Sequence, residues 1–332
     1  MLALSRRSIL LAGSAALAGC AHFDGSDAPP RLFYLGAAKV FLIDPAGGGP
    51  VTVVDQSPKD GSRGAGLNDG IALDPINRHI YWTNMGRAAE NDGYIMRSGI
   101  DGQSVTTIVK PGGTFTPKQL KISGNKLYWS DREGMAIQCC DLDGGNLETL
   151  VRTGDPVTDR GDQSRWCVGI AVDEQRGQLY WTQKGGDNAG QGMIRRAGLR
   201  MPPGATASTR QDIETLFSNL PEPIDLDLDL TSRTIYWTDR GDNTISRAPM
   251  DPKAGFDAAK RVDRVVLVKG LKEAIGVTLD LHRKMMAYTS LGGEVGVARL
   301  DGSNARMLAT EQGTLTGIVW ASSRFWDISQ VA

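Results

Sequence analysis

Short apolar runs alternate with polar turns along this chain, and the same succession returns about every fifty residues. In a typical unit an apolar run is followed by a turn, an aromatic segment, a polar loop and a segment that ends in Asp-Gly or a related pair, as at Asp101-Gly102, Asp143-Gly144 and Asp301-Gly302. This pattern predicts strands joined by hairpins rather than helices. The aromatic segments are nearly identical copies of one tetrapeptide: Tyr81-Trp82-Thr83-Asn84, Tyr128-Trp129-Ser130-Asp131, Tyr180-Trp181-Thr182-Gln183 and Tyr236-Trp237-Thr238-Asp239.

An aspartate seven residues before the tyrosine fixes the register of the repeat, as in Asp74, Asp173 and Asp229. The same spacing from Asp280 leads to a degenerate copy that starts at Ala287, and residues 32–35 form a sixth, weaker copy. Successive copies start between 47 and 56 residues apart. That is the length of one four-stranded propeller blade. We therefore predict an all-β fold, a six-bladed β-propeller that occupies residues 31–321.

The two ends of the repeat are predicted to complete one blade together. The first unit has no apolar run before it, whereas the C-terminal end carries an unmatched run, Gly317-Ile318-Val319-Trp320. Pairing of this run with residues 32–35 would close the ring and remove the open sheet edges that promote aggregation. Residues 322–332 are left as a C-terminal tail.

Residues 1–20 predict an export signal. Arg6-Arg7 resembles a twin-arginine motif, and the apolar stretch up to Ala18 is too short for a permanent membrane span. The segment Leu17-Ala18-Gly19-Cys20 resembles the lipobox of bacterial lipoproteins, in which Cys20 carries the lipid; the alternative is an ordinary cleavage region that contains a cysteine. Residues 21–30 then form a tether. The expected location is the periplasm or cell envelope after export across a bacterial inner membrane, with the lipid anchor as the membrane contact.

Composition argues against several classes of partner and site. The formal net charge is -1 and no long run of one sign occurs, so no nucleic-acid partner is expected. With only His22, His79 and His282 present, neither a histidine base nor a histidine metal centre is expected. The remaining cysteines, Cys139, Cys140 and Cys167, lack metal-site spacing; they are compatible with buried free thiols or with one disulfide to Cys167.

The tetrapeptides in register resemble the YWTD, or class B, repeats of low-density-lipoprotein receptors. This resemblance implies a six-bladed β-propeller that serves as a binding module beside other domains. The chain departs from it in Asn84 and Gln183, which replace the last aspartate, and in the degenerate first and last copies. Segment 68–75 is similar, more weakly, to gluconolactonase-like propellers, which hydrolyse lactones at a metal held by acidic and amide side chains.

Candidate site residues follow from the expected topology. The starts of the inner strands and the loops after the aromatic strands gather on one face, where function usually resides. At inner-strand positions that hold small residues in other blades, the third and fifth blades carry charged or amide groups. Two interpretations of these groups remain open. Either Lys121 pairs with Asp225 or Asp227 as a structural clasp, or the groups form the floor of a binding pocket. The candidate ligand-binding residues are Asn68, Asp69, Gln119, Lys121, Trp166, Asp225 and Asp227, with Asp92 and Asp187 from two insertions.

Two functional classes remain open at this stage. The first is an exported, lipid-anchored binding module for a small molecule, a glycan or a protein segment. The alternative is a metal-dependent hydrolase, lactonase or lyase that uses acidic residues at the channel mouth. Asp69 and Asp225 are the candidate ligands of Ca²⁺ or another divalent cation, since such ions prefer oxygen ligands. No other cofactor is indicated.

Overall fold

The computed structural model describes residues 30–58, 66–87 and 90–322. The predicted export signal, Cys20, residues 21–29 of the tether and residues 323–332 of the tail therefore lie outside the described residues. In the described part of the chain, no helix is long and apolar enough to cross a membrane.

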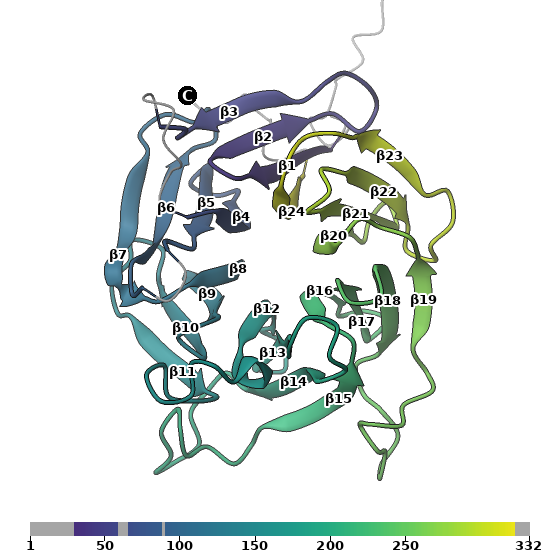
Figure 1. Ribbon diagram of the computed structural model, residues 1–332. Coiled ribbons are helices and arrows are strands. Elements are labelled where there is room, and N and C mark those ends of the chain that lie inside the picture. Colours follow the sequence, from purple (N-terminus) through teal and green to yellow (C-terminus); the bar gives the residue numbers. More distant parts are fainter. Residues whose placement is uncertain (1–29, 59–65, 88–89, 323–332) are drawn as a thin grey trace, which may run out of the picture.

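Six antiparallel sheets of four strands stand around a central axis like the blades of a propeller, which confirms the predicted fold (Figure 1). The first strand of each blade is innermost, and the inner strands contact one another around the axis. From the inside outwards the blades contain β24 (Leu315–Ala321), β1 (Arg31–Gly36), β2 (Lys39–Ile43) and β3 (Val51–Asp55); β4 (Asn68–Asp74), β5 (His79–Asn84), β6 (Gly93–Gly99) and β7 (Thr106–Thr114); β8 (Pro117–Ser123), β9 (Lys126–Asp131), β10 (Ala136–Asp141) and β11 (Glu148–Arg152); β12 (Cys167–Asp173), β13 (Gln178–Gln183), β14 (Gly192–Gly198) and β15 (Glu214–Leu220); β16 (Pro223–Asp229), β17 (Thr234–Asp239), β18 (Thr244–Pro249) and β19 (Val265–Val268); and β20 (Ala274–Asp280), β21 (Met285–Ser290), β22 (Val295–Arg299) and β23 (Arg306–Ala309).

The last strand closes the ring. Strand β24 pairs with β1, with Val319 opposite Phe33 and Ile318 opposite Tyr34. The predicted pairing of the C-terminal run with residues 32–35 is thereby confirmed. The first blade is built from both ends of the repeat, so the ring is held shut by backbone hydrogen bonds.

The aromatic pair of the tetrapeptide fills the layers between blades. Neighbouring strand residues point to opposite faces of a sheet, so the tyrosine and the tryptophan of one blade enter different layers. Tyr81 packs in one cluster with Trp129 of the next blade, and Tyr180 packs in another with Trp237. All four tetrapeptide tryptophans are fully buried. The sequence repeat is therefore a repeat of interblade packing.

The hydroxyl group of the tetrapeptide links each blade to the next. Between Cys167 and Ile170 the pairing of β12 with β13 shifts register, and the N–H group of Gly169 donates to Oγ1 of Thr182 at 2.8 Å. The same Oγ1 donates to the carbonyl oxygen of Ile224 in the following blade at 2.6 Å. One side chain thus satisfies a buried donor of its own blade and a buried acceptor of its neighbour.

This hydroxyl link recurs at every interface of the ring. In the first blade Leu35 follows the aromatic residues of the weak copy and has no hydroxyl. There Thr316 of the inner strand donates instead, to the carbonyl oxygen of Asn68 at 2.9 Å. At the other interfaces a side-chain hydroxyl donates to a backbone carbonyl oxygen of the next blade: that of Thr83 to Lys118, of Ser130 to Gly169, of Thr238 to Ile275 and of Thr289 to Thr316.

The two faces of the ring carry different connections. On the loop face the inner strands begin and the second strands end, and the connections 153–166 and 184–191 lie there. On the turn face lie the turns within blades, such as 230–233 and 281–284. The aspartate that sets the sequence register ends four of the six inner strands on the turn face. Asp229, for example, accepts from the N–H groups of Thr231 and Ser232 at 3.0 Å.

The cysteines are buried free thiols. Cys139 and Cys140 lie in β10, Cys167 begins β12, and none forms a disulfide. Burial raises the pKa of Cys139 to about 11 and the pKa values of Cys140 and Cys167 to about 12. The thiolate form, which is the reactive one, is therefore disfavoured at neutral pH.

Loss of one hydroxyl link should weaken the ring measurably. We expect Thr182→Val, which keeps the shape but leaves the Gly169 N–H and the Ile224 carbonyl without this partner, to lower the free energy of unfolding by about 1–3 kcal/mol. Urea unfolding followed by tryptophan fluorescence measures the change. The matched control is Thr107→Val at an exposed strand position, for which a change below about 0.5 kcal/mol is expected. Equal effects of the two substitutions would contradict the role of the link.

Candidate functional site

A cavity of about 360 Å³ opens on the loop face at the axis of the ring. Most of its wall comes from two rings of equivalent positions. One ring is the second residue of each inner strand, and the other is the residue directly after the aromatic tetrapeptide. The first ring contains Asp69, Lys118, Val168, Ile224, Ile275 and Thr316, and the second contains Met85, Arg132, Lys184, Arg240 and Leu291.

The first ring, formed by the second residue of each inner strand, is polar on one side and apolar on the other. Asp69, Lys118 and Thr316 come from adjacent blades, and three branched aliphatic side chains complete the ring. Asp69 forms an ion pair with Lys118, and Nε2 of Gln119 donates to Oδ1 of Asp69 at 3.1 Å. Burial lowers the pKa of Lys118 despite the attraction of Asp69. The Asp69 carboxylate is therefore bonded by protein groups of the next blade.

The second ring supplies cations from three successive blades. Glu222, of which only 2% of the side chain is exposed, accepts from Lys184 at 2.8 Å and from Arg240 at 2.7 Å. Asp187 contacts the same two cations at 2.9 and 2.8 Å, but 76% of its side chain is exposed. The buried carboxylate fixes the position of both cations, and the exposed one can be displaced by a ligand group.

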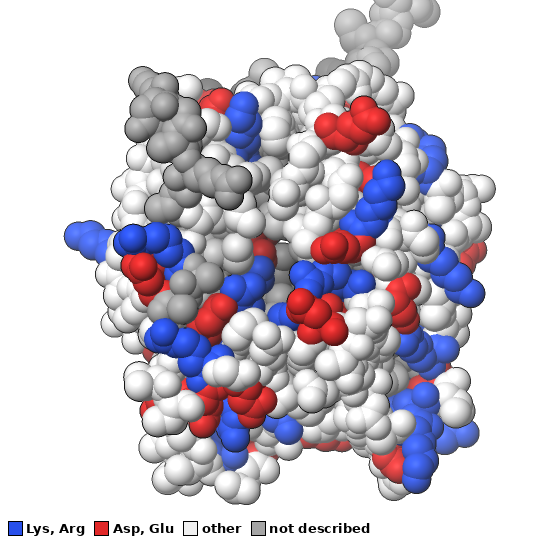
Figure 2. Space-filling view, viewed as in Figure 1, with Lys and Arg blue, Asp and Glu red and all other residues white. Residues whose placement is uncertain are grey.

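Trp166 forms the aromatic part of the wall. The guanidinium of Arg132 lies 5.0 Å and Nζ of Lys184 lies 5.7 Å from its ring centroid, so the ring is flanked by two cations. Its Nε1 donates to the carbonyl oxygen of Arg160 at 3.2 Å, which holds the ring in place. Figure 2 shows side chains of both charge signs gathered around the centre of the ring. The site can accept a group with oxygen acceptors beside a flat or aliphatic portion.

The structure brings some predicted site residues to the cavity and leaves others away from it. Asp69, Trp166 and Asp187 line the cavity. Gln119 does not line it but donates a hydrogen bond to Asp69. Asn68 is fully buried and accepts from Nδ2 of Asn84 at 3.0 Å. Asp92 accepts from the N–H group of Arg87 at 2.7 Å and braces its own loop instead of facing the cavity.

Lys121, Asp225 and Asp227 lie outside the cavity lining and make the contacts of a clasp. Nζ of Lys121 lies 3.6 Å from Oδ2 of Asp227, across the intervening blade. Asp225 accepts from the N–H group of Val277 at 3.0 Å, and Asp227 accepts from that of Leu279 at 3.1 Å. Burial raises the pKa of Asp225 to about 7. Burial also acts to lower the pKa of Lys121, but the nearby carboxylates outweigh it and the pKa is raised.

The two candidate metal ligands are not brought together. Asp69 is paired with Lys118 in the cavity wall, whereas Asp225 is bonded to backbone N–H groups outside it. In the described parts of the chain, no group of three or more His, Cys, Asp or Glu side chains is placed to hold a metal ion. Binding of Ca²⁺, and the metal-dependent hydrolase that would require such an ion, stay predictions without a ligand set in this structure.

Five charged residues of the cavity were not among the predicted site residues: Lys118, Arg132, Lys184, Glu222 and Arg240. A signal for three of them exists in the sequence. The residue directly after the tetrapeptide is Arg132, Lys184 and Arg240 in three successive copies. Comparison of that position between blades would have found them, but Glu222 and Lys118 carry no comparable mark.

The raised pKa of Asp225 predicts a dependence of stability on pH. The folded state holds the proton of the Asp225 carboxyl more tightly than the unfolded chain does. The stability that this protonation contributes is therefore fully present below about pH 4 and is lost as the pH rises through about 7. We expect Asp225→Asn, which cannot ionise, to become more stable relative to the wild type between about pH 4 and about pH 8. Urea unfolding at both values measures this.

The control is Asp257→Asn, because the N–H group of Ala259 lowers the pKa of Asp257 and its effect has the opposite sign. A difference between Asp225→Asn and the wild type that does not vary with pH would contradict the burial of an ionisable carboxyl at this position.

Several named proteins are similar to this chain in sequence. No family model matches the chain. A low-density lipoprotein receptor-related protein 1 of Pyricularia oryzae is 40% identical over 266 residues, which cover 76% of this chain and 84% of the relative. A 3-hydroxyacyl-CoA dehydrogenase-like protein, LAM1, of Cochliobolus heterostrophus is 38% identical over 268 residues, which cover 77% of this chain and 56% of the relative. The chain thus spans little more than half of that second protein.

A solved structure shows the same fold. A chain of the nidogen/laminin complex superposes with a TM-score of 0.65 at 22% sequence identity, covering 89% of this chain and 99% of that one. The fold, the aromatic repeat and the extensive identity to the Pyricularia protein lead to one conclusion: the chain belongs to the family of low-density lipoprotein receptor-related YWTD β-propellers.

Proposed function

We propose that this chain is a binding module that takes up a polar segment of a partner protein in the axial cavity of the loop face. The observation that carries the proposal is the wall formed by Trp166 with Arg132 and Lys184 close to its ring. An aromatic and an arginine at the centre of a concave face are the residue types that dominate binding energy at protein interfaces. The structure of a nidogen in complex with laminin supports a protein as the partner.

The dimensions of the site favour an inserted segment. A cavity of about 360 Å³ accommodates one or two side chains and not a folded domain. The surrounding loops of the same face can then contact the flanking residues of the partner.

The charges of the site favour a ligand group with oxygen acceptors. Glu222, which is buried, and Asp187, which is largely exposed, both form ion pairs with Lys184 and Arg240. A carboxylate or amide oxygen of the partner can replace Asp187 without uncovering a buried charge. This exchange avoids the cost of leaving a buried ion unpaired.

The Cochliobolus relative carries a dehydrogenase-like name. Nucleotide-dependent dehydrogenases bind their cofactor on a βαβ unit with a long helix. In the residues that the structure describes, the one helical element is the 3-10 turn η2 (Gln163–Arg165). A dehydrogenase activity would therefore need residues other than these.

We further propose that the module acts outside the cytoplasm on a lipid anchor at Cys20. The motif Arg6-Arg7, the apolar stretch after it and the segment Leu17-Ala18-Gly19-Cys20 support this.

A library of phage-displayed peptides panned against the immobilised protein tests the axial site. We expect enriched peptides to bind Trp166→Ala about thirty-fold more weakly than the wild type, because a central aromatic anchor is lost. Arg132→Gln should weaken the same peptides about five-fold. The control Lys110→Gln changes an exposed cation of the second blade and should leave binding unchanged. Thermal unfolding of each variant confirms that it is folded. Equal binding of the peptides to wild type and Trp166→Ala would exclude the axial cavity as the site.

Expression in a bacterium with labelled palmitate tests the anchor. The wild type should carry label and sediment with membranes, and Cys20→Ser should do neither. The control Cys167→Ser changes a buried thiol and should leave labelling unchanged. Labelling of Cys20→Ser, or wild type without label, would refute lipidation at this residue.

A further inference from the structure

On the turn face, one carboxylate of the fifth blade bonds to arginines of both the fourth and the fifth blade. Asp251 accepts from Arg176 at 3.0 Å, from Arg196 at 3.0 Å and from Arg233 at 2.8 Å. Arg233 also bonds to Asp173 at 2.6 Å. Three guanidinium groups thus share one acid, and the two blades are joined.

The next contact, between the fifth and sixth blades, has equivalent positions. Arg247 lies opposite Tyr236 as Arg196 lies opposite Tyr180. Arg247 donates to the carbonyl oxygen of Leu300 as Arg196 donates to that of Met250. The N–H group of Leu300 donates to the carbonyl oxygen of Lys284, as that of Met250 donates to the carbonyl oxygen of Arg233. By these matches Asp301 is the equivalent of Asp251, and Lys284 is the equivalent of Arg233.

At this second contact the equivalent carboxylate lines the cleft but forms no ion pair with its cations. Asp301 accepts from the N–H group of Ser303 at 2.9 Å and from its hydroxyl at 2.6 Å, within its own turn. Asp251 is followed by Pro252 and faces the arginines instead. As a result Arg247, Lys284 and Arg299 come within ion-pair distance of no carboxylate in the described residues, although they line one cleft.

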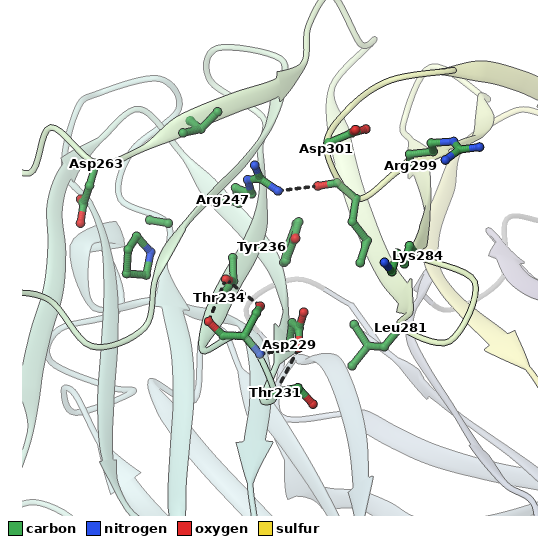
Figure 3. A pocket seen from close by; sticks show the side chains of 15 residues that line it. Asp229, Thr231, Thr234, Tyr236, Arg247, Asp263, Leu281, Lys284, Arg299 and Asp301 are labelled. Carbon is green, nitrogen blue, oxygen red and sulfur yellow. Dashed lines mark hydrogen bonds between the residues drawn. The ribbon is translucent and has the colours of Figure 1, made fainter.

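The cleft is large and partly apolar. Its volume is about 710 Å³, and Figure 3 shows Arg247 and Lys284 near Tyr236, with Arg299 farther along the wall. Val265 and Leu281 in its wall are 47% and 40% exposed. The other acids of the wall are bonded already: Asp263 to Arg261 at 2.9 Å, and Asp229 to the N–H groups of its turn. The cleft therefore combines three cations that form no ion pair within the described part of the chain, three aspartates that are bonded elsewhere, and exposed aliphatic surface.

We propose that this cleft is a second binding site, which takes an acidic segment of a partner protein. One carboxylate of the segment occupies the place that Asp251 has between the preceding blades, and its aliphatic neighbours contact Val265 and Leu281. A peptide and not a small anion fits the site, because the volume exceeds what one carboxylate fills and the exposed aliphatic side chains extend from the cations. The site is distinct from the axial cavity, which lies on the opposite face.

Titration of the full chain with acetyl-Leu-Asp-Leu-amide, followed by ¹H–¹⁵N NMR shifts, tests this site. We expect saturable shifts of the backbone amides of Ser232, Lys284 and Arg299, with a dissociation constant on the order of 1 mM. The double variant Lys284→Gln with Arg299→Gln should weaken binding at least about five-fold, because two cations are removed. The control pair Lys110→Gln with Lys269→Gln removes two exposed lysines elsewhere and should not change it.

Two further ligands decide between sources of the signal. Acetyl-Leu-Asn-Leu-amide should bind at least about five-fold more weakly, because it lacks the charge. Acetate should produce smaller shifts at equal concentration, because it lacks the aliphatic contacts. Equal binding of the asparagine peptide, wild-type affinity of the double variant, or equal shifts by acetate would each overturn the proposal. Shifts confined to the amides of Lys184 and Arg240 would overturn it as well, while leaving the axial site in place.

Discussion

The structure depends on one interaction, the hydroxyl group that connects each blade to the next. The register shift at the start of each inner strand leaves a backbone N–H without a strand partner, and a buried N–H of this kind is costly unless it is bonded. In four blades the threonine of the aromatic strand accepts from it and donates to the neighbouring blade. A Cβ on Gly169 would lie 2.3 Å from the carbonyl oxygen of Ile224, so the close approach of the blades also requires glycine there.

The position of the binding cavity follows from that link. The second residue of each inner strand lies next to the linked N–H group, and the residue after the tetrapeptide lies two positions beyond the hydroxyl. The scaffold bonds are made by the backbone and the hydroxyl, so the side chains at these two positions are free to differ between blades. Arg132 and Leu291 occupy equivalent positions for this reason, and the cavity has a charged and an apolar side.

The architecture could be predicted from the sequence because it is repeated. Spacing alone gave six blades and the pairing of residues 32–35 with the C-terminal run. The site could be predicted only in part, because it depends on differences between blades. The unusual residues Gln119, Lys121 and Asp225 bond to other protein groups outside the cavity lining, and Asp69 alone of the inner-strand candidates lines the axial cavity. The cleft on the turn face had no sequence signal, since it depends on whether Asp301 faces Ser303 or the arginines.

Amide hydrogen exchange measured by NMR tests the central role of the hydroxyl link most directly. The N–H groups of Gly70, Gly169, Asp225 and Gly276 each donate to a threonine oxygen. If the link holds the ring together, these four amides exchange as slowly as the slowest strand amides and only by global unfolding. Exchange of the four at the rate of the loop amides, while the strands stay protected, would contradict the account.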